Sequence, residues 1–253
     1  MFNQGEGIVI RTTPYGETNK IVTLFTREWG KIGVMARGAK KPSSKLSSCT
    51  QLFTVGSYLI QMSRGLGTLH QGEASQSMRH LREDIVLTAY AAYIVELVEK
   101  ATDERKPNPR LYEDLVLTLH YLQEEYDPDI MKVLFEIKML PLLGLKPTLN
   151  ECVNCKEKQG QFGFSVRENG FLCHRCFEID PYYIPISPST TKLLSQFSRI
   201  KLEQIGSINV KESTKKELNL VMEQYYETYT GLYLKSKGVL DQIKRVWNPG
   251  EGS

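Results

Sequence analysis

Four cysteines form two tight pairs, Cys152–Cys155 and Cys173–Cys176, with 17 residues between the pairs. Each Cys-x-x-Cys pair can direct two thiolates at one tetrahedral centre, and a spacer of this length can fold back as a short hairpin that brings the second pair round. The spacer holds an alternating run at 162–166 and the dipeptide Asn169-Gly170, which suits the positive φ angles of a type I′ turn. The pattern predicts a zinc ribbon at about 150–178, with two disulfides or chance spacing as the competing interpretations.

Four thiolates would fill the coordination shell of one Zn2+ ion and leave no position open for water or substrate. The predicted zinc is therefore structural, and any chemistry of the chain would have to lie elsewhere. His174 lies inside the second pair and could replace a cysteine as a ligand, but four sulfur ligands already suffice.

Catalytic constellations are absent from the sequence, and no catalytic residue is predicted. The four histidines form neither a HExxH motif nor a nucleophile–base pattern, and there is no phosphate-binding P-loop. Four carboxylates lie close together in the sequence at Glu96, Glu99, Asp103 and Glu104, and their preferred interpretation is a solvated helix end.

The net charge of +3 is unevenly distributed along the chain. Residues 1–80 carry 10 Lys and Arg against 4 Asp and Glu, whereas the remaining residues carry 22 against 25. A basic segment joined to a mildly acidic one indicates a polyanionic partner for the first segment.

The cations of the first segment are densest in Arg37–Lys45, which holds four of them together with Gly, Pro and two Ser. Such a composition predicts a loop between strands, and a cationic loop suits contacts with phosphates through release of counterions. An ordinary solvated loop is the alternative. The residues predicted to bind nucleic acid are Lys20, Arg27, Lys31, Arg37, Lys40, Lys41, Lys45 and Arg64. Among the aromatic residues, Tyr15 and Trp29 are expected in turns, where they could stack on bases.

The first 80 residues predict a small β-barrel. Five short runs rich in β-branched and aromatic residues are separated by turn signals, and they lie at 7–12, 21–26, 31–38, 53–60 and 67–74. The pattern then becomes helical. Helices are predicted at 82–100, after the Asn108-Pro109 start, at 129–143, at 190–197, and from a capping box at 214–217 to about residue 236.

The chain is therefore predicted to be an α+β multidomain protein, with a barrel at 1–80 and an α-helical domain at 81–253 that carries the zinc ribbon. No apolar run approaches the roughly 18 residues of a membrane span, and the N-terminus lacks the features of a signal peptide. Five cysteines, four of them in metal spacing, suit a reducing compartment, so we expect a cytoplasmic protein. Cys49 stands alone, as is typical of a small buried hydrophobic residue. The tail from Trp247 is expected to be loose.

Several segments together resemble the bacterial RecO family of recombination mediators, over nearly the full length. The likeness is carried by Gly-Ile-Val-Ile-Arg at 7–11, Pro-Tyr-Gly-Glu-Thr at 14–18, Ile-Val-Thr-Leu-Phe-Thr at 21–26, Ala-Arg-Gly-Ala-Lys-Lys-Pro at 36–42, Arg-Gly-Leu-Gly-Thr-Leu at 64–69 and Tyr-Leu-Lys-Ser at 233–236. The order of barrel, helices and cysteine pairs also agrees with the family.

The resemblance implies an OB-fold that binds single- and double-stranded DNA, and a helical domain that carries the zinc ribbon. It implies a non-enzymatic role in DNA repair, in which the protein anneals complementary strands, engages the C-terminal tail of the single-strand-binding protein SSB, and acts with RecR to load RecA onto SSB-coated DNA. A nucleoid-associated location follows from this role. An acidic tail with an apolar end needs a cation beside an apolar groove, for instance Lys132 or Lys138 near Phe135.

Two other classes of function remain as alternatives. An RNA-binding OB-fold protein would share the basic barrel. An enzyme acting on nucleic acid could combine an OB barrel with a four-cysteine zinc module, as NAD-dependent DNA ligases do, but their KxDG motif is absent from this chain.

Overall fold

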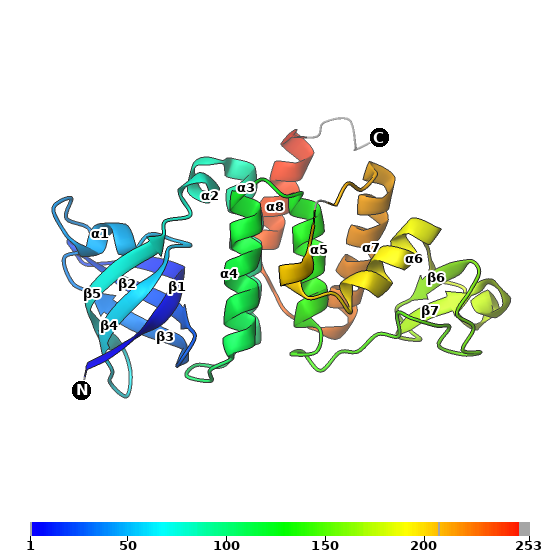
Figure 1. Cartoon of the computed structure of the whole chain (residues 1–253), viewed down its shortest axis with the longest axis horizontal. Coiled ribbons are helices and arrows are strands. Elements are labelled where there is room, and N and C mark those ends of the chain that lie inside the picture. Colours follow the sequence, from blue (N-terminus) through cyan, green and yellow to red (C-terminus); the bar gives the residue numbers. More distant parts are fainter. Residues whose placement is uncertain (1, 207, 248–253) are drawn as a thin grey trace. The chain divides into compact units, whose positions relative to one another are not determined.

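The computed structural model describes residues 2–206 and 208–247. The chain divides into two compact units, the first made of Met1–Glu125 together with Leu234–Ser253 and the second of Tyr126–Tyr233. Figure 1 colours the elements of both units along the sequence, from blue at the N-terminus to red at the C-terminus. The tail that was expected to be loose lies almost wholly outside the described residues, which end at Trp247 in a helix.

A closed five-stranded barrel forms the first part of unit one, with the strand order β1-β2-β3-β5-β4 (Figure 1). Its strands are β1 (Phe2–Tyr15), β2 (Asn19–Thr26), β3 (Gly30–Ala36), β4 (Val55–Gln61) and β5 (Gly67–Gln76). All neighbours pair antiparallel except β3 and β5, which pair parallel over three residues each. The prediction of an N-terminal OB-fold barrel followed by helices is thereby confirmed.

Alternating inward residues of the strands fill the barrel with apolar side chains. The core contains Val9, Val22, Leu24, Ile32, Val34, Ala36, Ala39, Cys49, Tyr58, Ile60 and Leu69. Cys49 is only 1 % exposed and ends the short helix α1 (Leu46–Cys49), so it is a buried core residue as predicted. The hydroxyl of Tyr58 donates to the carbonyls of Cys49 (2.9 Å) and Thr54 (3.2 Å), which ties this segment to β4.

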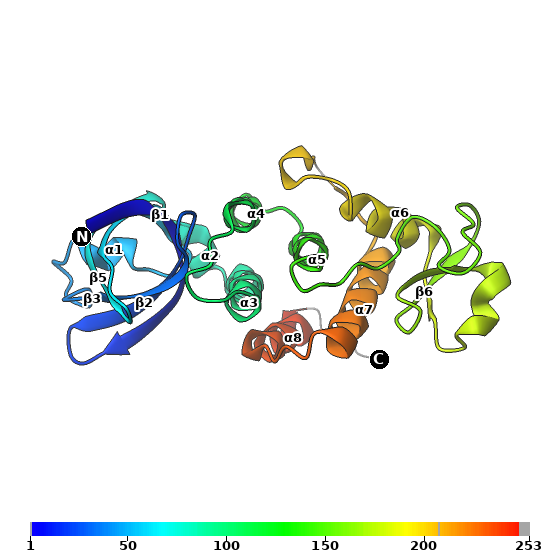
Figure 2. The same cartoon turned by 90° about the horizontal axis from the view of Figure 1, so that it is seen from below.

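Four helices complete unit one: α2 (Arg79–Glu83), α3 (Ile85–Ala101), α4 (Pro109–Gln123) and α8 (Lys235–Trp247). Figure 2 views α3 and α4 nearly end-on, with α8 beside α3. The single helix predicted at 82–100 is wrong at its start, because Asp84 accepts a hydrogen bond from the backbone N–H of Leu87 (2.8 Å) and thereby begins α3 as a separate helix. The predicted start of α4 is confirmed, with Asn108 as its N-cap and Pro109 in its first turn.

Unit two combines helices with a small sheet. It contains α5 (Pro128–Met139), β6 (Phe162–Ser165), β7 (Gly170–Cys173), the 3-10 helix η1 (His174–Ile179), β8 (Ile184–Pro185), α6 (Pro188–Phe197), the 3-10 helix η2 (Leu202–Gln204) and α7 (Glu212–Tyr229). The three strands form a sheet in the order β7-β6-β8.

Two predicted helices in unit two have wrong bounds. The α7 helix begins at Glu212, before the expected capping box, and it ends at Tyr229 instead of near residue 236. The Glu217 carboxylate of that box instead accepts hydrogen bonds from the backbone of Ser187 (2.7 Å) and the hydroxyl of Thr190 (2.5 Å), at the start of α6. The α5 helix ends at Met139, two residues before Pro141.

The two compact units do not divide the chain where its sequence pattern changes. The expected boundary near residue 80 falls inside unit one, because α2, α3, α4 and α8 belong to the same unit as the barrel. The division into a barrel domain at 1–80 and a helical domain at 81–253 therefore stays a prediction. Within the described part of the chain, no helix combines the length and apolarity that a bilayer crossing requires.

The α8 helix is held to α3 at its first turn by Glu96. The carboxylate of Glu96 accepts hydrogen bonds from the backbone N–H groups of Lys235 (3.1 Å) and Ser236 (2.8 Å) and from the hydroxyl of Ser236 (2.5 Å). An anionic acceptor at this end satisfies N–H groups that have no partner within the helix, and it is favoured by the helix dipole. The sequence-based interpretation of Glu96 as part of a solvated helix end is therefore wrong.

Replacing Glu96 with Gln is expected to lower the free energy of unfolding by about 1 kcal/mol at neutral pH, because a neutral amide is a weaker acceptor at a helix N-terminus. Burial opposes ionisation of Glu96, but the hydrogen bonds from Ser236 and Lys235 outweigh it and lower its pKa. The stabilisation is thus complete above the pKa of an unfolded glutamate and is lost as the pH falls through the lowered pKa. Urea unfolding of Glu96→Gln and wild type, each at neutral and at acidic pH, measures this. The difference between their free energies of unfolding should be smaller at acidic pH.

The matched control is Glu83→Gln, which removes one partner of an exposed ion pair with Arg79 and should change the stability little. A Glu96→Gln protein as stable as wild type at neutral pH would contradict the assigned role of Glu96.

Candidate metal cluster and nucleic-acid surface

The two cysteine pairs meet in unit two. Their four sulfur atoms all lie within 4.8 Å of one another, and the sulfurs of Cys155 and Cys173 are 3.4 Å apart. In a tetrahedral site with zinc–sulfur distances of about 2.3 Å, sulfurs are separated by about 3.8 Å. The donor set and its spacing therefore fit a single tetrahedral metal ion. His174 is exposed and is not part of the cluster.

A hairpin brings the second pair to the first. Strands β6 and β7 pair from Phe162 with Cys173 to Ser165 with Gly170, which places Cys173 at the end of the hairpin and Cys176 just beyond it in η1. The predicted two-residue type I′ turn is wrong, because the connection has four residues, 166–169. Asn169 does adopt positive φ (60°), but Gly170 has φ 151° and already belongs to β7.

Hydrogen bonds to sulfur prepare the cluster to carry negative charge. The backbone N–H of Cys173 donates to the sulfur of Cys152 (3.4 Å), and the side-chain amide of Asn154 donates to the sulfur of Cys176 (3.4 Å). Burial acts to raise the pKa of Cys152, but the surrounding N–H groups outweigh it and lower this pKa to about 6. For Cys173, burial together with the neighbouring thiols raises the pKa to about 12. Ionisation of one thiol thus opposes ionisation of the next, and a bound dication would relieve this repulsion.

Tyrosines of α7 brace the hairpin. The ring of Tyr225 packs edge-on against Phe164 (centroids 5.7 Å apart), and its hydroxyl hydrogen-bonds the side-chain oxygen of Asn169 (2.5 Å). The hydroxyl of Tyr229 donates to the carbonyl of Val166 (2.6 Å) in the hairpin turn. On the adjoining face, Tyr226 donates to the carbonyl of Glu136 (2.8 Å) in α5. One helix therefore links the cysteine hairpin to the rest of unit two.

The basic segment 37–45 leaves the barrel as a loop directly after β3. The backbone of Lys40 donates to the carbonyl of Thr18 (2.9 Å), its ammonium group donates to the carbonyl of Gly16 (3.3 Å), and the N–H of Gly38 donates to the side chain of Asn19 (2.9 Å). The loop is thus fixed beside the β1–β2 turn. Tyr15, at the edge of that turn, is 54 % exposed.

Most of the residues predicted to bind nucleic acid have charges that are not neutralised by a carboxylate. Lys20 pairs with Ala36 at the start of β2 and therefore lies next to the basic loop. Arg37, Lys40, Lys41, Lys45 and Arg64 are exposed. Within residues 2–206 and 208–247, none of these six cations forms an ion pair with a carboxylate. Arg64 lies in the β4–β5 loop, away from segment 37–45 in sequence.

Arg27 and Lys31, two of the predicted DNA-binding residues, make contacts within unit one. They lie at the opposite end of β2 from Lys20, where Arg27 pairs with Glu113 (2.7 Å) and Glu6 (3.6 Å). The ammonium group of Lys31 donates to the backbone carbonyls of Glu99 (2.5 Å) and Thr102 (2.6 Å) at the end of α3. A cation at a helix C-terminus satisfies carbonyls that have no partner in the helix. These two cations therefore join the barrel to the helices of unit one and do not extend the basic loop.

Trp29 and the proposed tail-binding residues are less available than expected. Trp29 is partly buried and packs against the barrel core. In α5, Phe135 is fully buried and the ammonium group of Lys132 pairs with Glu136 (3.0 Å). Lys138 donates to the carbonyl of Ile200. The suggested combination of an apolar groove around Phe135 with a free cation is therefore wrong.

Known proteins similar to the chain match both of its parts. The family model described as recombination protein O N terminal matches residues 1–78, and the one described as recombination protein O C terminal matches residues 82–238. The DNA repair protein RecO of Bacillus subtilis (strain 168) is 58% identical over 246 residues, which cover 97% of this chain and 96% of that protein. The corresponding protein of Bacillus pumilus (strain SAFR-032) is 55% identical, with the same coverage of both chains.

Replacing Lys31 with Met should lower the free energy of unfolding by about 1–2 kcal/mol, because two carbonyls at the end of α3 lose their charged donor. Urea unfolding measures the change. The matched control is Lys20→Met, which makes the same substitution on the neighbouring strand at a lysine that forms no ion pair with the described residues and should alter stability little. Equal stabilities of the two variants would contradict the role assigned to Lys31.

Proposed function

Because this chain belongs to the RecO family of DNA repair proteins, we propose that it is a recombination mediator that binds single- and double-stranded DNA and anneals complementary strands. In this role it acts with RecR to load RecA onto single strands coated with SSB, whose C-terminal tail it engages. The observation that carries the proposal is the basic loop with Arg37, Lys40, Lys41 and Lys45, together with Lys20 of the adjoining β2, because none of these five cations is neutralised by a carboxylate among the described residues.

The physical basis of annealing is the suppression of repulsion between two polyanions. Cations on one end of the barrel neutralise phosphates and release condensed counterions, which gives affinity without sequence preference. Base pairing between the strands then supplies the specificity, so the protein needs no catalytic group. Arg64 would extend the phosphate contacts from a different loop of the barrel.

The four-cysteine cluster has a structural role in this proposal. Zinc is the ion that best suits four thiolates in a tetrahedral arrangement, and such a site leaves no open position for substrate. Cys152, Cys155, Cys173 and Cys176 would hold it and thereby fix a hairpin whose strands have only four residues each.

An RNA-binding role is the alternative that shares the same surface, and comparing single-stranded DNA with RNA of the same sequence separates the two. The repair role places the protein in the cytoplasm at the nucleoid.

Replacing Cys152 with Ser should release the bound zinc and destabilise unit two more than it weakens DNA binding, because the cluster lies in a different unit from the basic loop. Metal content by atomic emission, thermal unfolding and DNA binding by fluorescence anisotropy measure the three effects. Cys49→Ser serves as the control for metal content, since Cys49 lies outside the cluster. A stably folded Cys152→Ser protein that retains zinc would contradict the proposed ligand set.

The test of the function itself is annealing of complementary oligonucleotides precoated with SSB. Wild type should accelerate annealing, and the triple variant Arg37→Ala/Lys40→Ala/Lys41→Ala should not. If three phosphate contacts are lost, the slope of log affinity against log salt for single strands should fall by about 2, at about 0.7 per phosphate.

The matched control removes the same charge from unit two with Lys146→Ala/Lys158→Ala/Lys192→Ala, three exposed lysines. This variant should anneal like wild type if the position of the charge decides activity. Failure of wild type to accelerate annealing at low salt would overturn the mediator role, and equal defects in both triple variants would overturn the role of the basic loop.

A further inference from the structure

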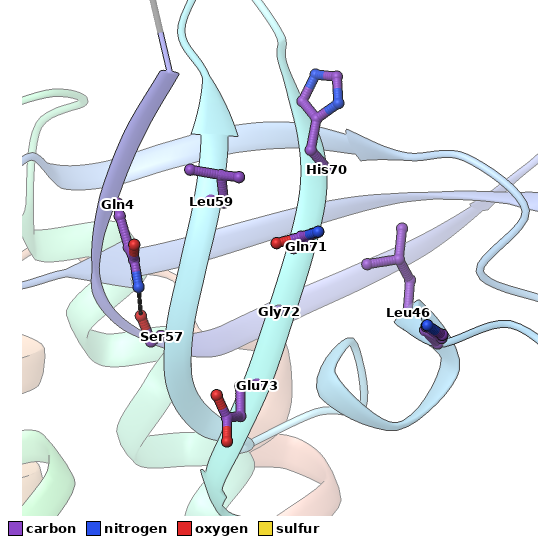
Figure 3. A pocket seen from close by; sticks show the side chains of 9 residues that line it. Gln4, Leu46, Ser57, Leu59, His70, Gln71, Gly72 and Glu73 are labelled. Carbon is purple, nitrogen blue, oxygen red and sulfur yellow. Dashed lines mark hydrogen bonds between the residues drawn. The ribbon is translucent and has the colours of Figure 1, made fainter.

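A cavity of about 400 Å³ opens on the outer face of β1, β4 and β5, and neither the metal cluster nor the proposed phosphate contacts account for it (Figure 3). Strands β4 and β5 run side by side through its floor. Gln4 of β1 borders one side, and Leu46 of α1 borders the other. This volume lies in the range of sites that hold small organic groups.

An irregularity in β5 shapes the cavity. Ile60 pairs with Leu69, but the preceding Leu59 pairs with Gln71, so His70 is an extra residue without a partner on β4. A bulge of this kind lets two consecutive side chains face the same side of a sheet, and His70 and Gln71 are both exposed and both line the cavity. In a regular strand, one of the two would point into the barrel core.

The lining offers neutral hydrogen-bonding groups above an apolar floor. Gln4 donates to the hydroxyl of Ser57 (3.1 Å), and the amide of Gln71 lies across the cavity from this pair (Figure 3). Leu59 supplies apolar surface between them, and Leu46 supplies apolar surface on the side opposite Gln4 (Figure 3). Amides and hydroxyls in this arrangement can pair with the edges of a planar heterocycle, since an amide both donates and accepts.

Two aromatic rings border the same face. The imidazole of His70 meets the ring of Phe2 edge-on, with centroids 4.8 Å apart at 88°, and its Nε2 donates to the amide oxygen of Gln61 (3.2 Å). Phe2 remains 57 % exposed. Exposed and oriented rings of this type provide surfaces on which bases stack.

The charge around the cavity is polarised. Lys45, the last cation of the basic loop, lines one end, whereas Glu73 lines the β5 side. A phosphate is attracted to Lys45 and repelled by Glu73, while an exocyclic amino group of a base can donate to the Glu73 carboxylate. The cavity therefore adjoins the basic loop at Lys45. Its charge distribution suits a base better than a second phosphate.

We propose that this cavity receives one unpaired base of single-stranded DNA, which stacks on His70 and hydrogen-bonds to Gln4 and Gln71 while its phosphate is held by Lys45. The inference rests on the proposed DNA-binding function and adds a site to it. In a duplex the bases are paired and stacked, so the cavity favours single strands over double strands. It therefore distinguishes the substrate of annealing from its product.

The test compares wild type with His70→Ala/Gln71→Ala on three ligands of equal length: a single strand of deoxythymidine, an abasic single strand and a duplex. Fluorescence anisotropy gives the affinities at one salt concentration. The variant should bind the thymidine strand at least about fivefold more weakly than wild type does, with the abasic strand and the duplex unchanged. Wild type itself should prefer the thymidine strand to the abasic strand.

The matched control is Gln51→Ala/Gln76→Ala, which removes two exposed side chains of the same unit that do not line the cavity and should leave all three affinities unchanged. Circular dichroism confirms folding of each variant. Equal binding of thymidine and abasic strands by wild type, or an unchanged affinity in the His70→Ala/Gln71→Ala protein, would overturn the base site and leave the basic loop intact. If the base site is wrong but the proposed function is right, Arg37→Ala/Lys40→Ala/Lys41→Ala still loses binding whereas His70→Ala/Gln71→Ala does not. If the proposed function itself fails, wild type binds none of the three ligands.

Discussion

Closure of the barrel by the short parallel pairing of β3 with β5 is the constraint on which the rest of unit one depends. Val34, Met35 and Ala36 are the last residues of β3, and they pair with Gly67, Thr68 and Leu69, the first residues of β5. Because β3 ends with this pairing at Ala36, the chain leaves the sheet at Arg37 as an exposed loop. Because β5 continues along β4 alone, it can accommodate an extra residue at His70. The positions of the basic loop and of the cavity on β1, β4 and β5 are both set by the point at which β3 and β5 stop pairing.

Unit two meets a different constraint. Its hairpin strands have four residues each, and so small a sheet is at best marginally stable on its own. Two devices compensate for its size: the cluster of four cysteines at one end of the hairpin, and the tyrosines of α7, whose hydroxyls reach Val166 and Asn169 at the turn. The hairpin is therefore fixed at both ends, and its alignment does not rest on strand pairing alone.

Local patterns allowed much of this architecture to be predicted. The cysteine spacing predicted a clustered set of sulfurs, alternation predicted the five barrel strands, and Asn108-Pro109 predicted the start of α4. The errors arose where partners are distant in sequence. Glu96 caps a helix that begins 139 residues later, and Lys31 reaches the end of α3, 68 residues away. Charge alone could not separate Lys31 from Lys41, because the difference lies in which backbone carbonyls the fold brings near.

The cavity could not be predicted for the same reason, because the residues that form it are far apart in the sequence. A bulge depends on how two strands align with each other, so it cannot be predicted from the sequence of β4 or of β5 alone. His70 therefore had no signal beyond being a histidine in a strand. The positions that distinguish this barrel from any small basic barrel are thus those set by register and by long-range pairing.

The return of α8 to unit one makes that unit discontinuous, with all of unit two inserted between its segments. During synthesis on the ribosome, α3 is complete long before the helix that covers it, and Leu240 of α8, 1 % exposed in the finished fold, emerges only after all of unit two. Unit two can therefore fold while unit one is still incomplete. A premature stop after α7 would spare the entire barrel sequence and yet leave the apolar face of α3 open to aggregation.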